Sequence, residues 1–180
     1  MNEMNYPNIT AHVTVTRANE LAPSDLHDLC AAAEDAIVRG GGFGWLTVPP
    51  RAKLEAYWRG LMMISGRHLF VARLDGVVTG ALQLHEAPSN MESQASIGKL
   101  QTGFTASEAR GYGIGRKLME HAIAHARSLG LTAVKLDVRE TQETAINLYR
   151  SLGFVEWGRM PRYACIDGTW VGGLYFYLDL

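Results

Sequence analysis

The sequence predicts a mixed α/β (α+β) domain whose first half is antiparallel, and three patterns carry this prediction. Alternating apolar and polar residues at His12–Arg17 are typical of a half-buried strand. Two apolar runs flank the turn dipeptide Asp75-Gly76, which indicates a β-hairpin. Later in the chain, a helix with one apolar stripe lies between two strands, which indicates a right-handed βαβ crossover. We expect residues 1–180 to form one domain, since this length suffices for a core of its own.

The elements before residue 106 are expected in the order strand, two helices and three strands. Ser24 is a good N-cap residue for the first helix, and Pro49 and Pro50 start the second. The predicted segments are the strand His12–Arg17, a helix from Ser24 to about Arg39, a loop at Gly40–Trp45, a helix after Pro50, strands at His68–Leu74 and Val77–His85, a polar loop at Glu86–Gln94 and a strand within Ser96–Thr105.

The second half alternates helices and strands. Apolar residues from Ile114 to Leu129 form one stripe at helical spacing, and Gly130 ends that helix. The remaining predicted segments are a strand at Ala133–Val138, a helix at Gln142–Leu152 closed by Gly153, a strand that starts at Phe154–Gly158, a turn at Asp167-Gly168 and a last strand centred on Leu174–Leu178.

Composition and charge exclude several classes of protein. Hydrophobic residues make up 47 % and charged residues 19 %, which excludes overall disorder. The net charge of −1 and the pI near 6.6 give no basic footprint for nucleic acid. No apolar run reaches the roughly 18 residues of a membrane span, and the first residues lack the pattern of a signal peptide. Because Cys30 and Cys165 have no metal-like spacing, we expect free thiols and a cytoplasmic protein.

The most informative segment is Ala109–Met119 (ARGYGIGRKLM), where glycine takes every second position between a strand and a helix. Glycine weakens either element by about 0.5–1 kcal/mol relative to alanine. Without Cβ atoms, however, consecutive N–H groups converge on an anion, and the helix N-terminus adds unpaired donors. Arg110 and Arg116 supply positive charge beside them. The segment therefore predicts a phosphate site, and a plain glycine-rich turn is the alternative.

Neither common nucleotide-binding motif fits this segment. The dinucleotide fingerprint needs glycine where this chain has Arg116, and its ribose-binding acid is missing because the nearest candidate, Asp137, lies in mid-strand. A P-loop needs Gly-Lys followed by Ser or Thr, whereas this chain reads Gly115-Arg116-Lys117.

Two segments resemble signatures of the GCN5-related N-acetyltransferase (GNAT) family. Arg110, Gly113 and Gly115 match the pattern Arg/Gln-x-x-Gly-x-Gly/Ala of its pyrophosphate loop, and AINLYRSLGF (Ala145–Phe154) looks like its helix ending in Leu-Gly-Phe. The tail GRMPRYACIDGTWVGGLYFYLDL is similar to the subgroup that contains the tabtoxin-resistance acetyltransferase. The resemblance implies a single mixed, mostly antiparallel central sheet with helices on both faces. It also implies that the two strands of the crossover splay apart around the cofactor.

The resemblance implies acetyl-CoA or coenzyme A as the cofactor, with its pyrophosphate on the backbone of residues 111 to 116. The strand within Ser96–Thr105 is expected to offer backbone donors to the pantetheine arm and the thioester carbonyl. Tyr149 is the expected catalytic acid toward the coenzyme A sulfur, and a place in the core is its alternative reading. Asn147 is expected to bind the pantetheine or the acceptor, and a solvent-facing helix residue is its alternative. The cofactor-binding residues implied are Phe104, Thr105, Arg110, Gly111, Tyr112, Gly113, Ile114, Gly115, Arg116, Asn147 and Tyr149.

The general base is left open. Many relatives carry a glutamate on the strand before the pyrophosphate loop, but nothing acidic lies between Glu92 and Glu108. A water relay is one answer, and four residues elsewhere are weak candidates: Glu34, Asp35, His85 and Glu86. The acceptor-site candidates are Phe43 and Trp45 as a lip, with Glu34 and Asp35. The pair His121 and His125 lacks the glutamate of HExxH and a third ligand, so we predict surface histidines and no metal.

The sequence thus predicts an acetyl-CoA-dependent N-acetyltransferase. It is expected to acetylate a primary amine of a small molecule (a metabolite, toxin or antibiotic-like compound) by direct attack on the thioester. Two alternatives stay open: acetylation of a protein N-terminus or lysine, and a catalytically silent acyl-CoA-binding sensor domain. The expected partners are the small-molecule amine and a second copy in a homodimer, with no nucleic acid and no membrane.

Overall fold

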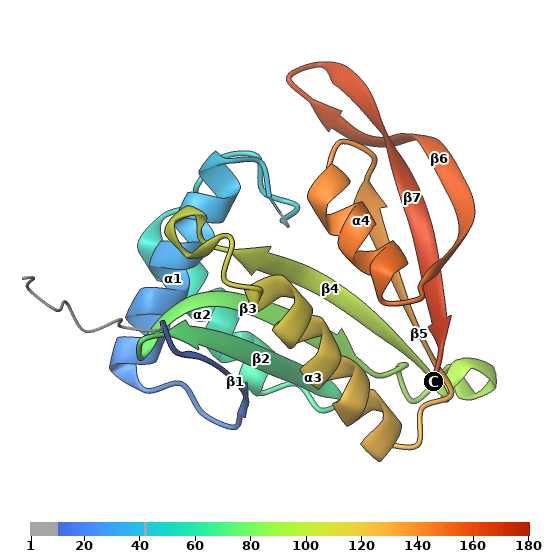
Figure 1. Cartoon of the computed structure of the whole chain (residues 1–180), viewed down its shortest axis with the longest axis horizontal. Coiled ribbons are helices and arrows are strands. Elements are labelled where there is room, and N and C mark those ends of the chain that lie inside the picture. Colours follow the sequence, from blue (N-terminus) through green and yellow to red (C-terminus); the bar gives the residue numbers. More distant parts are fainter. Residues whose placement is uncertain (1–10, 42) are drawn as a thin grey trace, which may run out of the picture.

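The computed structural model describes residues 11–41 and 43–180, and Figure 1 shows their arrangement. The predicted order of strands and helices is confirmed, with two short 3₁₀ turns added. The elements are β1 (Val13–Ala18), α1 (Pro23–Val38), α2 (Arg51–Met62), β2 (Arg67–Leu74), β3 (Val77–His85), η1 (Glu92–Gln94), β4 (Ile97–Thr105), η2 (Ser107–Ala109), α3 (Ile114–Ser128), β5 (Ala133–Arg139), α4 (Glu143–Ser151), β6 (Val155–Ile166) and β7 (Thr169–Asp179).

All seven strands lie in one sheet of order β1-β2-β3-β4-β5-β7-β6. Every neighbouring pair is antiparallel except β4 and β5, which are parallel and joined by α3. The prediction of a single mixed, mostly antiparallel sheet is confirmed.

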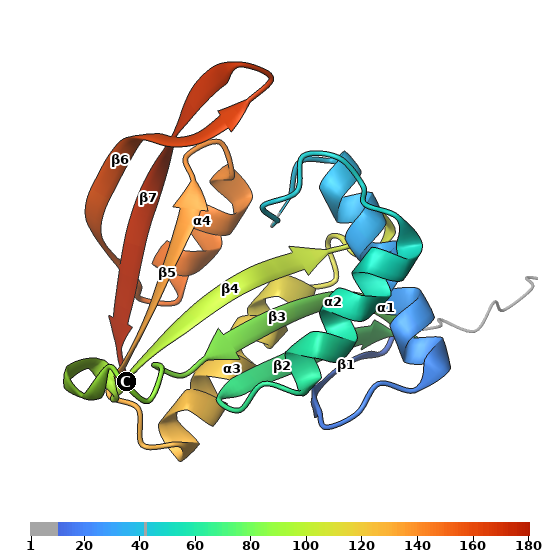
Figure 2. The same ribbon diagram turned by 180° about the vertical axis from the view of Figure 1, so that it is seen from behind.

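Helices cover both faces of the sheet, as predicted: α3 lies in front in Figure 1, and α1 and α2 lie in front in the reverse view of Figure 2. The strand β2 is buried on both sides because its side chains alternate between two cores. Phe70 and Ala72 face the core under α3, whereas Leu69 and Val71 face the core under α1 and α2. Within the described residues no helix is long and apolar enough to cross a membrane.

The start of α1 differs from the sequence prediction. Its N-cap is Ala22, and Ser24 makes no capping hydrogen bond, so the predicted cap at Ser24 is wrong. Pro23 explains the shift, because a proline in the first helical turn has a suitable φ angle and lacks the N–H that a cap would satisfy. The first helical bond runs from the Leu26 N–H to the Ala22 carbonyl at 2.9 Å.

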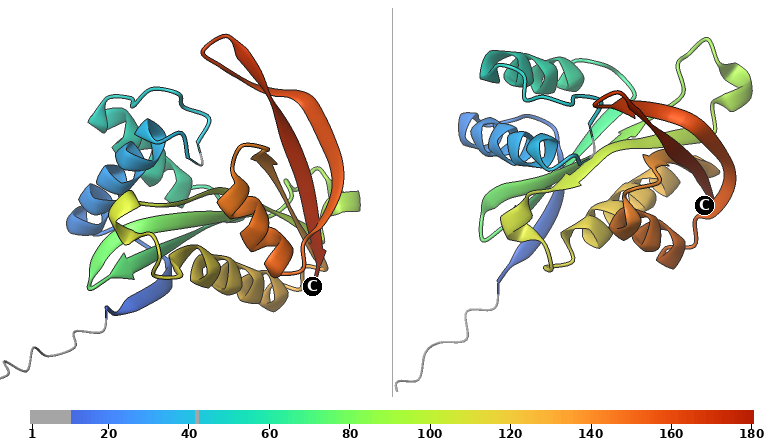
Figure 3. Two further views of the ribbon diagram at one scale, coloured as in Figure 1. Left: turned by 45° about the horizontal axis from the view of Figure 1, so that its top comes forward. Right: turned by 90° about the horizontal axis from the view of Figure 1, so that it is seen from above.

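The last two strands form a long hairpin that projects beyond the helical layers (Figure 3). The sequence predicted only the beginning of β6, because Pro161 and the absence of strict alternation after Gly158 obscure the pattern. Pro161 is tolerated since β6 is the edge strand, where a missing N–H removes no ladder bond.

Candidate functional site

The candidate site lies where β4 and β5 separate. Their parallel pairing covers only Ile97–Lys99 against Ala133–Lys135. Beyond it β4 stays with β3 and β5 stays with β7, so the two strands splay as predicted (Figure 1). A cavity of about 280 Å³ fills the space between them. Its walls are Phe43, Gly44, Leu82, Lys99, Leu100, Gln101, Thr102, Gly103, Met119, Leu136, Asp137, Val138, Arg139, Gln142, Ala145, Tyr149 and Tyr163.

The edge of β4 that borders the cavity has no strand partner in the described chain beyond Lys99, and it carries a bulge. The register to β3 shifts between Ala81 and Gln83, and opposite this shift Thr102 has φ 54°. A positive φ is a true outlier for a β-branched residue. The backbone of Thr102 and Gly103 therefore leaves the regular ladder next to the cavity. Phe104 and Thr105, around which donors were predicted, stay paired with Ala81 and Gly80 of β3 and do not line the cavity.

The glycine-rich turn presents a run of free amides. Gly111 and Gly113 have φ 88° and 73°, and a Cβ at either position would meet open space. In the described part of the chain, no N–H from Gly111 to Arg116 donates to a protein acceptor, and the first helical bond is Lys117 N–H to the Gly113 carbonyl at 3.1 Å. These amides, with the N-terminus of α3, form the kind of concavity that binds anions.

The side chains around this turn are exposed apart from Ile114. Ile114 is buried and anchors the first turn of α3 in the core, and Gly115 lies against Leu148 of α4. Arg116 donates to the Ser151 hydroxyl at 2.6 Å, which fixes a cation beside the free amides. Arg110 and Tyr112 extend into solvent at the mouth of the turn.

Tyr149 lies between the core and the cavity, and its catalytic role stays a prediction. Its ring packs on Phe154 and Phe176 at the edge of the core, and it also lines the cavity. Burial raises the pKa of Tyr149 to about 12, and the carboxylate of Asp137 adds to this effect. The hydroxyl therefore stays protonated at neutral pH and remains a hydrogen-bond donor.

Asn147 lies apart from the cavity. It is exposed on α4 and borders a shallow depression with Glu143 and Arg150 instead. The structure does not bring it together with Tyr149, and a role for it in binding stays a prediction.

The structure adds three polar residues that the site prediction missed: Lys99, Asp137 and Tyr163. Lys99 Nζ lies 2.8 Å from Asp137 Oδ1, and the Tyr163 hydroxyl donates to Asp137 Oδ2 at 2.5 Å. All three line the cavity. A signal for Asp137 exists in the alternation of β5, where Val134, Leu136 and Val138 are buried and the intervening residues are polar.

The loop between α1 and α2 closes one side of the cavity. Phe43 and Gly44 line it, whereas Trp45 stacks on Phe43 at 5.8 Å and packs against Tyr57 instead. The carbonyl of Gly40 accepts hydrogen bonds from Arg139 at 2.6 Å and from Gln142 at 2.9 Å. The loop is therefore held to the opposite wall, which β5 and α4 form.

The predicted acidic candidates of α1 do not line the cavity. Glu34 pairs with Arg51 at 2.9 Å. Asp35 accepts from the backbone and hydroxyl of Ser107 and pairs with Arg39. Burial opposes ionisation of Asp35, but these hydrogen bonds outweigh it and lower its pKa. Asp35 thus holds the segment that leads into the glycine turn.

The other two candidates for the base also have partners elsewhere. His85 is buried, and the guanidinium of Arg67 lies 2.7 Å from its Nδ1. Burial and then the charges of Arg67 and Lys99 lower the pKa of His85 to about 4, so it is a poor base at neutral pH. Glu86 lies 2.7 Å from His68 Nε2.

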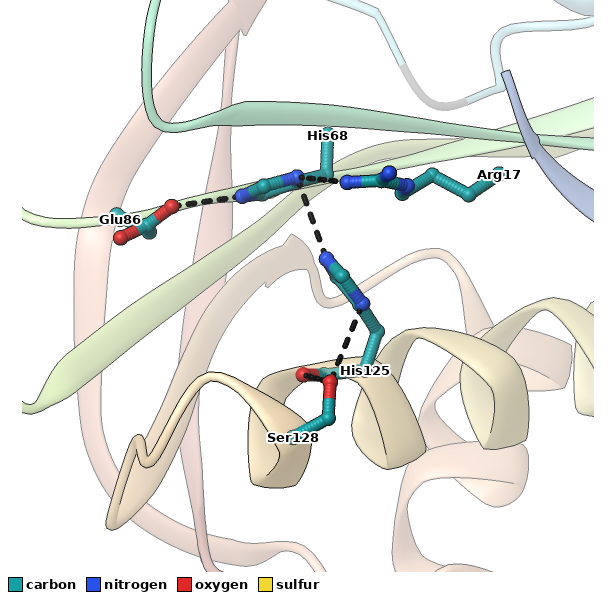
Figure 4. Close-up of polar contacts among 5 residues, drawn as sticks. All are labelled: Arg17, His68, Glu86, His125 and Ser128. Atoms are coloured by element: carbon teal, nitrogen blue, oxygen red, sulfur yellow. Dashed lines mark hydrogen bonds and ion pairs between the residues drawn. The ribbon is translucent and has the colours of Figure 1, made fainter. Parts of the chain in front are cut away.

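A second polar cluster lies between β2 and α3 (Figure 4). His68 joins Glu86, Arg17 and His125, with 3.3 Å between His68 Nδ1 and His125 Nε2. His125 is therefore half-buried rather than on the surface as predicted, and burial followed by the charges of His68 and Arg17 lowers its pKa. His121 is exposed and bonds the Lys117 carbonyl. In residues 11–41 and 43–180, no three His, Cys, Asp or Glu side chains, this cluster included, are arranged so that they could hold a metal ion.

Comparison with known proteins agrees with this geometry. Residues 27–154 match the acetyltransferase (GNAT) family. Over 130 residues the chain is 48 % identical to an uncharacterized N-acetyltransferase in the hisH-hisA intergenic region of Azospirillum brasilense, covering 72 % of this chain and 77 % of that protein.

Solved structures show the same fold. An N-acetyltransferase from Staphylococcus aureus Mu50 superposes with a TM-score of 0.81 and 18 % identity, covering 93 % of this chain and 98 % of the other. A phosphinothricin acetyltransferase from Sinorhizobium meliloti, solved in complex with acetyl-CoA, gives 0.79 and 21 % identity over 93 % and 88 % of the two chains. The splayed strands, the glycine turn and these matches lead to one conclusion: the chain belongs to the GNAT family of acetyltransferases.

Proposed function

We propose that this chain transfers the acetyl group of acetyl-CoA to a primary amine of a small molecule. The observation that carries the proposal is the run of free amides from Gly111 to Arg116 at the N-terminus of α3, next to the cavity between β4 and β5. Such amides suit the diphosphate of coenzyme A. The free edge of β4 then offers hydrogen bonds to the pantetheine arm, which leads into the cavity.

When bound, acetyl-CoA would supply the thioester that the amine attacks, and coenzyme A would leave as the thiolate, which takes a proton from water. Tyr149 donates a hydrogen bond to the sulfur as negative charge develops there. Because its pKa is about 12, complete proton transfer from Tyr149 to a thiolate is uphill. Its contribution is therefore a fixed donor in a desolvated site, of the kind that stabilises developing charge.

Asp137 takes the place of the missing glutamate of β4. Its carboxylate lies in the cavity between Lys99 and Tyr163, and an alkylammonium ion is drawn to such a group. The amine must lose a proton before it attacks, since an alkylamine is protonated at pH 7 (pKa about 10.4). This first proton passes to solvent, since a carboxylate is too weak a base to hold it. We assign to Asp137 the binding of the ammonium group and the acceptance of the second, more acidic proton, which the nitrogen loses as the C–N bond forms.

The size and cover of the cavity support a small acceptor over a protein. Its volume of about 280 Å³ lies at the low end of ligand pockets, which span roughly 300–1,000 Å³. Phe43 and Gly44 cover it, and the bonds from Arg139 and Gln142 to Gly40 hold that cover in place. A peptide acceptor would need an open groove instead.

Arg139 forms no ion pair in the described chain, so amines with a carboxylate belong among the acceptors tested.

The placement of the diphosphate is tested with a matched pair of glycines. At both Gly113 and Gly130 an added Cβ would meet no protein atom, and the two φ angles are nearly equal (73° and 76°). In Gly113→Ala the Cβ lies among the free amides, whereas in Gly130→Ala it lies at the far end of α3. Each variant should be as stable as the wild type or less stable by about 1 kcal/mol, because the left-handed conformation costs alanine about 1–2 kcal/mol and the lower chain entropy of alanine offsets about 0.5–1 kcal/mol. Calorimetry with acetyl-CoA should show binding weakened by about tenfold or more (about 1.4 kcal/mol) in Gly113→Ala alone. Equal affinity in the two variants would refute the placement.

The acceptor class is tested by thiol release from acetyl-CoA. The panel holds small amines with and without a carboxylate, a peptide with a free N-terminus and a lysine peptide. Turnover on small amines alone supports the proposal, and turnover on the peptides alone supports the protein acetyltransferase. Tight binding of acetyl-CoA with no turnover on any amine would identify the sensor domain.

A further inference from the structure

Tyr163 reaches the cavity from the edge strand by an unusual route. In the β6–β7 ladder Met160 pairs with Gly173 and Ala164 pairs with Val171. Between these pairs, Pro161, Arg162 and Tyr163 face Gly172 alone, so β6 carries a bulge with two extra residues. A bulge of this kind re-aims a side chain. Here it turns the ring of Tyr163 inward across the neighbouring strand.

The missing side chain at Gly173 leaves the space that the ring of Tyr163 occupies. A Cβ added to Gly173 would overlap Cγ and Cδ2 of Tyr163, so the ring lies directly on the backbone of β7. No other residue type leaves this space free. Gly173 has no positive φ, which means that the turn chemistry of glycine does not explain it. Its role is to let one side chain cross the strand.

Beyond Gly173 the hydroxyl of Tyr163 ends on Asp137 of β5. It donates to Oδ2 at 2.5 Å, while Lys99 of β4 holds Oδ1 at 2.8 Å. The carboxylate is thus fixed from both sides and lines the cavity with its two partners. Burial and this hydrogen bond raise the pKa of Tyr163, so its hydroxyl keeps its proton and continues to donate.

We propose that Tyr163 is a positioning residue for acetyl transfer: through the gap at Gly173 it fixes the carboxylate of Asp137 toward the acceptor amine. This inference rests on the proposed function, in which Asp137 binds the amine and accepts its proton. The competing reading is that Tyr163 only fastens the β6–β7 hairpin to the sheet. The two readings differ in what the hydroxyl does once the ring is kept in place.

The test begins with Tyr163→Phe, which keeps the ring and removes the hydroxyl. We expect kcat/KM for the amine to fall by about tenfold or more, as for the loss of a hydrogen bond to a charged group, with acetyl-CoA affinity unchanged by calorimetry. In an Asp137→Asn background the same change should have no further effect on kcat/KM. Tyr175→Phe is the control, because Tyr175 lies on β7 beside Tyr163 and, within the described chain, its hydroxyl bonds only the sulfur of Met160. It should keep full activity.

Gly173→Ala tests whether the space at Gly173 is what lets the Tyr163 ring cross β7. It displaces the ring, so it should lower kcat/KM at least as much as Tyr163→Phe. Because displacing the ring also lowers stability, the change is compared in a Tyr163→Ala background, where the ring is gone. There the added methyl group should leave activity unchanged and should not lower the urea midpoint. A further loss in that background would overturn the role assigned to Gly173.

The outcomes separate this inference from the proposed function. Full kcat/KM in Tyr163→Phe, or equal losses in the wild-type and Asp137→Asn backgrounds, would overturn the inference and leave the function standing. A wild-type chain that acetylates no amine would overturn the proposed function. In that case urea unfolding of Tyr163→Phe, Asp137→Asn and the double variant still tests the contact, and strictly additive losses of stability would overturn it.

Discussion

At the scale of single residues, the sequence predicted the site residues that lie in local motifs, but not those that neighbouring strands bring together. Tyr149 could be predicted because its helix and the following Leu-Gly-Phe are contiguous in the chain. Lys99, Asp137 and Tyr163 come from three strands, and their contacts depend on the registers of β4, β5 and β6. A register cannot be read from local pattern alone when the strand is bulged, as β6 is.

The role of Tyr149 leads to a prediction for Tyr149→Phe. The variant keeps the packing on Phe154 and Phe176 and loses only the donor toward the sulfur. We expect turnover to fall by about 10²-fold, the lower end of the cost of losing one fixed donor to developing charge, with acetyl-CoA affinity nearly intact. Steady-state kinetics on an accepted amine, together with calorimetry, measures both quantities. Unchanged turnover would remove Tyr149 from the chemistry and leave it a core residue.

At the scale of elements, the order of helices and strands was predictable because apolar periodicity and turn residues are local signals. The two irregular strands were not. The bulge of β4 contains no glycine at its strained position, so Thr102 gave no sign of its φ of 54°. The second half of β6 carries Pro161 and mixed polarity, which argue against a strand by pattern. Both irregular segments border the cavity, where function outweighs local preference.

The strain at Thr102 leads to a prediction about stability. Thr102→Gly removes a left-handed conformation that costs an L residue about 1–2 kcal/mol. It adds about 0.5–1 kcal/mol of chain entropy lost on folding. We therefore expect unfolding in urea to show a variant as stable as the wild type or more stable by about 1 kcal/mol. The matched change Thr105→Gly, on the same strand at a negative φ, should be destabilising. Similar losses in both variants would mean that the bulge stores no strain.

At the scale of the whole molecule, one sheet with a core on each face buries a polar network around His85 as well as apolar side chains. His85 contacts Arg67, Gln83 and Gln101, and Gln83 in turn donates to Tyr57 of α2 at 2.8 Å. The network links β2, β3, β4 and α2, and it accommodates His85 only in the neutral form. The whole fold therefore responds to protonation at this one site.

The pH dependence of stability that His85 causes has a definite direction. An unfolded histidine titrates near pH 6.5, whereas burial and then the charges of Arg67, Lys99 and His68 lower the pKa of folded His85 to about 4. Between these values the unfolded chain binds a proton that the folded chain does not, so stability falls as the pH falls from about 6.5 to about 4. Above pH 6.5 this group contributes no slope.

We expect His85→Gln to flatten the fall of Tm over that window. Carboxylates such as Asp35 also titrate at the acid end, so the difference between variant and wild type is the quantity to measure. His121→Gln, at an exposed position, serves as the control and should leave the slope unchanged. Parallel curves for the wild type and His85→Gln would contradict the assignment.

The short pairing of β4 with β5 has a mechanical consequence. Among the described residues, strand pairing joins β1–β4 to β5–β7 only from Ile97–Ala133 to Lys99–Lys135. At the open end of the gap between β4 and β5, the Gly40 carbonyl accepts hydrogen bonds from Arg139 and Gln142 on the far side. The ion pair of Lys99 and Asp137 spans the same gap. The loop that carries Phe43 can therefore move away from β5 only when the bonds from Arg139 and Gln142 to Gly40 break.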